Sequence, residues 1–234
     1  VNNTIIGGLA GDALTSGGQN VAVGKASLSS ATTANDNVGV GHGTLSSLTT
    51  SARNVAIGTQ ALNGAMNTNS NTYNVAVGYQ AGMAVTTGLE NTFIGGLAGT
   101  ALTSGVSNVA LGYAALATSV DGDNNTAIGY AALLAYEDGD GNGHNTAVGA
   151  ASQSAAISGE FNTSLGSQSM GSGVTTGDNN VSLGYRAGVA LTSGAQNILI
   201  GRGAGDALTT GLNNVAVGHE ALGTQIVHGQ NVAV

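Results

Sequence analysis

An asparagine recurs along this chain with a 17-residue period, and this spacing limits the fold more than any other feature. Ten of the thirteen intervals equal this period, two are 20 and one is 18, so the repeating unit carries three insertions. A fixed period of this kind is the signature of stacked repeats and fits no helical or heptad pattern. The asparagines are Asn3, Asn20, Asn37, Asn54, Asn74, Asn91, Asn108, Asn125, Asn145, Asn162, Asn180, Asn197, Asn214 and Asn231.

Each of these register asparagines begins the same short motif. Counted from the asparagine, position +1 is Val, Thr or Ile, position +3 is aliphatic, and position +4 is Gly in all thirteen complete units. This pattern predicts a β-strand that ends in a turn. Because strand side chains alternate between faces, we expect +1 and +3 to face the core and +2 to face outward.

Position +2 is unusual for an outward position, since it is Ala, Ser or Gly in eleven of fourteen units and never Lys, Glu or Asp. Small residues allow close approach of another backbone, so this column predicts contact between chains. The alternative is an exposed alanine face on a monomer. Position +7 is always Ala, Ser or Thr and +8 is mostly Leu or Gly, which predicts a second short strand in each unit.

A unit of this size cannot bury its own apolar face and must stack on its neighbours. The sequence therefore predicts an all-β fold, a parallel β-solenoid (β-roll) of about fourteen 17-residue coils. Residues 1–234 form one continuous array, which we expect to be a segment of a longer fibre. The asparagines either form a hydrogen-bonded ladder along the stack or simply suit a left-handed turn. The absence of Pro fits continuous strand ladders.

Composition excludes several classes of function. Charged residues are 7% of the chain, and the net charge is −8, which argues against nucleic-acid binding. No segment approaches the ~20 apolar residues of a membrane span, so we expect no membrane insertion. There is no Cys, the four His are scattered over different coils, and neither G-x-S-x-G nor H-E-x-x-H occurs. We therefore expect a protein without enzymatic activity.

The motif Asn20-Val-Ala-Val-Gly, and its longer form Asn125-Thr-Ala-Ile-Gly-Tyr-Ala-Ala-Leu, resembles the head repeats of YadA-like trimeric autotransporter adhesins. It is also similar to repeat arrays in long phage tail fibres. The resemblance covers the whole chain, although the coil here is longer than the family's head repeat. It implies a left-handed β-roll, a homotrimer, an extracellular or virion location, and host attachment without catalysis.

Position +5, after the glycine, collects aromatic and basic side chains that could contact a cell-surface receptor or glycan. An amphipathic ring offers stacking area and a polar tip. The simpler explanation is that the tyrosines pack across neighbouring Gly or Ala and are structural. Lys25 and Arg202 share this column with the candidate contact residues, which are Tyr79, Tyr113, Tyr130, Tyr185, His42 and His219.

Five of the twelve acidic residues, counting Glu137, fall between Asp121 and Asp140, in the same turn of two adjacent units. The run from Asp138 to Gly143 resembles the start of a calcium loop, in which alternate residues supply oxygen ligands. The loop lacks its final Glu, so the neighbouring coil would have to complete the site. The alternative is a solvated acidic loop. The candidate calcium ligands are Asp138, Asp140, Asn142, Asp121 and Asp123.

Taken as a whole, the sequence predicts a structural or adhesive fibre segment, a stiff spacer whose turns contact a receptor or glycan. A self-assembling extracellular filament is the main alternative. Adjacent Thr or Ser pairs such as Thr32-Thr33 raise the further possibility of an ice-binding solenoid, although turn hydrogen bonding explains them more simply. A glycan-degrading spike would need paired carboxylates, for which only the acids between Asp121 and Asp140 qualify.

Overall fold

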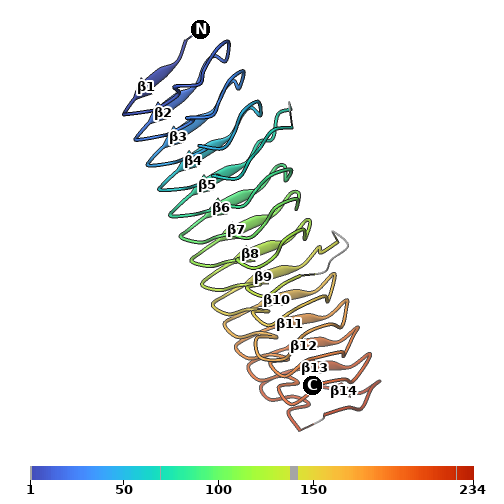
Figure 1. Ribbon diagram of the computed structural model, residues 1–234. Helices are drawn as coiled ribbons and strands as arrows, with labels where there is room; N and C mark the ends of the chain where they lie inside the picture. Colours follow the sequence, from blue (N-terminus) through green and yellow to red (C-terminus); the bar gives the residue numbers. More distant parts are fainter. Residues whose placement is uncertain (1, 69, 138–141, 225) are drawn as a thin grey trace. The chain divides into compact units, whose positions relative to one another are not determined.

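The computed structural model describes residues 2–68, 70–137, 142–224 and 226–234, and it divides into two compact units. Unit 1 is Val1–Ala114 and unit 2 is Ala115–Val234. Each unit is a stack of coils with one short strand per coil, and the described residues contain no helix. Figure 1 shows the strands following one another in chain order within each unit.

Every strand begins directly after a register asparagine, as the sequence predicts. Unit 1 contains β1 (Thr4–Ile6), β2 (Val21–Val23), β3 (Val38–Val40), β4 (Val55–Ile57), β5 (Val75–Val77), β6 (Thr92–Ile94) and β7 (Val109–Leu111). Unit 2 contains β8 (Thr126–Ile128), β9 (Thr146–Val148), β10 (Thr163–Leu165), β11 (Val181–Leu183), β12 (Ile198–Ile200), β13 (Val215–Val217) and β14 (Val232–Ala233).

Neighbouring strands within each unit pair in parallel and in register. Ala22 of β2 lies opposite Gly39 of β3, and Ser182 of β11 lies opposite Leu199 of β12, so equal positions of successive coils stack on one another. The predicted fold class is confirmed at this level: the chain is all-β and forms parallel β-solenoid coils with the 17-residue repeat.

The prediction of which strand face is buried is wrong. The middle residue of the strand, position +2, points into the coil: Ala22, Ala56 and Ala110 are fully buried. Positions +1 and +3 point outward, and Ile57 and Leu165 are 40% and 47% exposed. The physical reason is the small cross-section of the coil, which has room for one small strand residue beside a leucine from the turn. The alanine column therefore packs inside the chain and does not contact a partner.

The predicted second strand is also absent from the described residues. Positions +7 and +8 lie in a turn and are buried, as for Ser27 and Leu28. The residue at +8 has a left-handed backbone, with φ of 50° at Leu28 and Leu45 and 46° at Leu62. This conformation turns the leucine side chain inward, where it fills the space left by the small +2 residue. An extended strand cannot continue through a residue in this conformation, although the Leu28 amide still donates to the Thr44 carbonyl of the next coil at 3.0 Å.

Where the +2 residue is large, the +8 positions around it are glycine. The ring of Phe93 lies between Gly82 and Gly99, and a Cβ atom at Gly99 would lie 2.3 Å from Phe93 Cε1. Leu199 lies between Gly188 and Gly205 in the same way, with a Cβ atom at either glycine 2.8 Å from a Leu199 methyl carbon. The interior volume of a coil is thus kept constant by exchanging large and small residues between two positions.

The register asparagines form a buried hydrogen-bonded ladder within each unit. Asn20 Oδ1 accepts hydrogen bonds from the backbone N of Asn37 at 3.0 Å and from its Nδ2 at 3.3 Å. Asn20 Nδ2 donates to the Ala34 carbonyl at 2.8 Å. The left-handed residue is the one before the asparagine, such as Asp36 with φ of 58°. The ladder explanation is therefore confirmed, and the left-handed turn belongs to the preceding position.

Candidate functional site

The outward sheet face of each unit is largely apolar and carries no charged residue. Positions +1 and +3 of all fourteen strands are Val, Ile, Leu or Thr. Seven strands contribute to this face in each unit. We call it the outward apolar face. Its more exposed members include Ile6, Ile57, Ile94, Val109, Leu111, Leu165, Val181, Leu183 and Ile198.

The predicted receptor-contact column at +5 is exposed at every candidate residue. Tyr79 and Tyr113 are each 55% exposed in unit 1, and Tyr130 and Tyr185 are exposed in unit 2, as are His42 and His219. A Cβ atom at Gly96 would lie 3.4 Å from Tyr113 Cδ2, so this ring packs along a neighbouring glycine. The structural explanation applies to Tyr113, while more than half of its surface remains available for contact.

Stacking brings two residues of the +5 column into direct contact in unit 2. Arg202 Nη1 lies 2.7 Å from His219 Nε2, and both side chains lie beside Glu220. Glu220 Oε1 is 3.8 Å from Arg202 Nη1 and 3.6 Å from His219 Nε2. The repeat spacing predicts that Arg202 and His219 lie together, but it does not indicate that Glu220 lies beside them or that Asp206 lies nearby.

A second exposed column, at the residue before each register asparagine, was missed by the sequence analysis. In unit 1 the Arg53 guanidinium lies 5.6 Å from the centroid of the Tyr73 ring and donates to its hydroxyl at 2.6 Å. In unit 2 the rings of His144 and Phe161 stack with centroids 5.1 Å apart. The recurrence of large side chains directly before Asn was the available signal. This column is a further surface on which contacts with other molecules can form.

The candidate calcium ligands are only partly described. Asp138 and Asp140 lie outside the described residues. Asp121 and Asp123 are half-buried, and Asn142 is exposed, with its backbone carbonyl accepting from the Tyr136 hydroxyl at 3.0 Å. Among the described residues no group of three His, Asp or Glu could hold a metal ion. The calcium site remains a prediction.

The Thr pairs late in each coil are turn residues. The first hydroxyl of a pair donates to the backbone carbonyl of the equivalent residue one coil later, as Thr32 does to Thr49 at 3.2 Å and Thr192 to Thr209 at 3.1 Å. These hydroxyls tie successive turns together. The turn explanation of the pairs is therefore confirmed.

No protein-family model matches the chain, and a search of curated proteins finds no significant match. In the described part of the chain, no helix has the length and hydrophobicity required to cross a membrane. The surfaces described above are therefore the basis on which a function can be proposed.

Proposed function

We propose that this chain is a structural and adhesive segment of an extracellular or virion-borne fibre, in which copies associate through the outward apolar face. The observation that supports the proposal is the absence of charge from both outward columns of all fourteen strands. A sheet face exposed to water normally carries polar residues in alternation with buried ones. An extended uncharged face instead marks a surface for association.

Burial of this face would provide the energy for assembly. Apolar surface removed from water contributes roughly 25 cal/mol per Å², and a stable interface buries about 800 Å² on each partner. Fourteen strands offer Val, Ile, Leu and Thr side chains in a repeating pattern, so each coil can contribute the same contact. Most soluble homo-oligomers have closed point-group symmetry. We propose a left-handed coil and a homotrimer, because the resemblance to trimeric adhesin heads implies both.

The role proposed for each unit is that of a stiff spacer without catalytic activity. Backbone and asparagine hydrogen bonds connect each coil to the next within a unit, so bending has to distort many bonds together. The turn columns at +5 and before each asparagine remain outside the outward apolar face and can contact a receptor or glycan. Calcium bound by the acids between Asp121 and Asp140 would fasten one turn of unit 2.

The experiment that tests assembly is light scattering of the purified chain, compared with two single lysine variants. We expect a mass of three times 22.5 kDa for the unmodified chain. Ile57→Lys places a charge on the outward apolar face and should give monomers, because an unpaired charge in an apolar interface is strongly unfavourable. Thr59→Lys, two residues later in the exposed +5 column, is the matched control and should leave the mass unchanged.

A monomeric unmodified chain at high concentration would refute association through this face. Open-ended growth with concentration would replace the closed trimer by the self-assembling filament. If Thr59→Lys gave monomers while Ile57→Lys kept the mass of the unmodified chain, the interface would lie at the turns and not at the strands.

A further inference from the structure

The charged residues of three neighbouring coils in unit 2 lie in one turn. Between Asn180 and Gln230 the chain has four charged residues, and all four fall within the six positions that follow the strand glycine. The coils concerned are those of β11, β12 and β13. The rest of each coil in this segment is uncharged. The four residues are Arg186, Arg202, Asp206 and Glu220.

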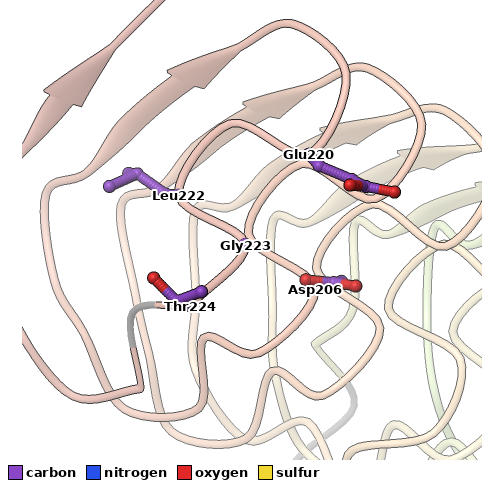
Figure 2. A pocket seen from close by; sticks show the side chains of 5 residues that line it. All are labelled: Asp206, Glu220, Leu222, Gly223 and Thr224. Atoms are coloured by element: carbon purple, nitrogen blue, oxygen red, sulfur yellow. The ribbon is translucent and has the colours of Figure 1, made fainter.

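Two of these residues, Asp206 and Glu220, line a cleft at this turn. The cleft has a volume of about 340 Å³ and is lined by Asp206, Glu220, Leu222, Gly223 and Thr224. A Cβ atom at Gly223 would lie 3.3 Å from Asp206 Oδ1, so the absence of a side chain there keeps the carboxylate accessible. Figure 2 shows the residues that line the cleft, among them the carboxylates of Asp206 and Glu220.

A smaller hollow of about 50 Å³ adjoins the cleft and shares two of its residues. It is lined by Tyr185, Arg186, Arg202, Gly203, Asp206 and Glu220. Asp206 and Glu220 thus belong to both cavities. The Tyr185 ring is 47% exposed beside them. We call the two cavities together the turn cleft. Its larger part alone falls within the range of about 300–1,000 Å³ found for small-molecule sites.

The charges of the turn cleft determine which ligand it suits. Two arginines and two acidic residues line the turn cleft, so the formal charges of its lining sum to zero. A metal cation needs an excess of carboxylate and an anion needs an excess of guanidinium. A sugar needs both donors and acceptors, because each hydroxyl donates one hydrogen bond and accepts others. The Tyr185 ring adds a flat apolar surface for the C–H face of a pyranose ring.

We propose that the turn cleft is a binding site for a neutral pyranose, with Asp206 and Glu220 accepting from neighbouring hydroxyls and Arg202 donating to ring or hydroxyl oxygens. The Tyr185 ring packs against the sugar face. The proposal rests on the proposed function in one respect, since it names the glycan class that the fibre contacts. Sugar binding is measured on each chain independently of its assembly, so the failure of one proposal leaves the other testable.

The test is saturation-transfer NMR of the full chain with millimolar methyl glucoside, methyl mannoside and methyl galactoside. We expect transfer to at least one of these neutral sugars. Tyr185→Ala and Asp206→Asn should each weaken binding about tenfold or more, whereas Tyr185→Phe retains the ring and should bind. Ile157→Ala is the control, because this exposed side chain of unit 2 lies outside the turn cleft and outside both turn columns. Tyr79→Ala, at the same +5 position in unit 1, is compared with Tyr185→Ala to test whether the effect belongs to the cleft or to the whole column.

Three outcomes would overturn the proposal. One is the absence of transfer to every neutral sugar of the panel. Another is equal loss of binding in Tyr79→Ala and Tyr185→Ala, which would show non-specific contact along the tyrosine column. The third is stronger binding of an anionic sugar such as sialic acid, which would mean that the guanidinium groups dominate. Circular dichroism of each variant verifies that the coils remain folded.

Discussion

In most strands of each unit, the inward residue is small and the two outward residues are larger. Ala110 of β7 is fully buried, whereas Val109 and Leu111 on either side are 37% and 42% exposed. A globular sheet places its large residues on the buried face. A narrow coil is instead limited by interior volume, so large apolar residues move to the outside, where another copy can cover them.

The largest expected effect comes from the interior. Phe93→Ala removes a fully buried ring that lies between Gly82 and Gly99, and neither glycine can fill the space. We expect a loss of about 3–5 kcal/mol in the free energy of unfolding, measured by urea denaturation followed by circular dichroism.

The double variant Phe93→Ala/Gly99→Leu tests whether volume is exchanged between +2 and +8. It recreates the pair Ala56 and Leu62 of the β4 coil, where the leucine already has φ of 46° against 57° at Gly99. We expect the double variant to recover about 1–3 kcal/mol relative to Phe93→Ala. A double variant less stable than Phe93→Ala would show that the two positions do not share one space.

The next effect concerns the asparagine ladder. Asn91 Oδ1 accepts from the backbone N of Asn108 at 2.9 Å, and Asn91 Nδ2 donates to the Gly105 carbonyl at 2.8 Å. Asn91→Ala leaves these buried groups without partners, so unfolding should require about 2–3 kcal/mol less. Asn35→Ala is the control, because exposed Asn35 bonds the Gly18 amide at 2.9 Å and its loss should change stability by under about 1 kcal/mol. Equal losses would contradict a special role for burial in the ladder.

The smallest effect is expected on the outward apolar face of a chain kept monomeric by Ile57→Lys. In that background Leu111→Thr should alter the free energy of unfolding by at most about 0.5 kcal/mol, because the side chain is already exposed. Ala110→Val, one residue earlier, should cost about 1–3 kcal/mol by overpacking the coil. The same urea titration measures both. A larger loss of unfolding free energy for Leu111→Thr than for Ala110→Val would contradict the conclusion that the volume inside the coil limits the size of its residues.

Much of the fold follows from the spacing of the asparagines. The position of every strand after Asn, the parallel stacking and the 17-residue coil were all predictable from the register. The inward face was not, because alternation separates two sets of side chains without saying which set points inward. Which set points inward depends on the volume available inside the coil. The left-handed backbone of the leucines at +8 could not be predicted either. Leucine ordinarily avoids positive φ, and here tertiary packing overrides that preference.

The candidate site was predictable to the same limited extent. Equal positions of successive coils stack, so the approach of Arg202 and His219 follows from their shared +5 position. Asp206 occupies +9 and Glu220 occupies +6, and their convergence on one cleft depends on the path of the turn. A period alone does not describe that path. The aromatic pairs before the asparagines were missed because the residue type at that position varies from coil to coil.

The exchange of large and small residues around Phe93 also limits how such an array can change in length. A gain or loss of one whole coil preserves the ladder and the strand register wherever the interior is Ala with Leu. The Phe93 ring instead occupies space in both the β5 and β6 coils, through Gly82 and Gly99. Deleting the β5 coil would remove Gly82 from beside the ring, whereas deleting the β6 coil would remove the ring together with Gly99. Duplication or deletion of a coil should therefore be tolerated least at this point. We expect Phe93, Gly82 and Gly99 to be retained or lost together.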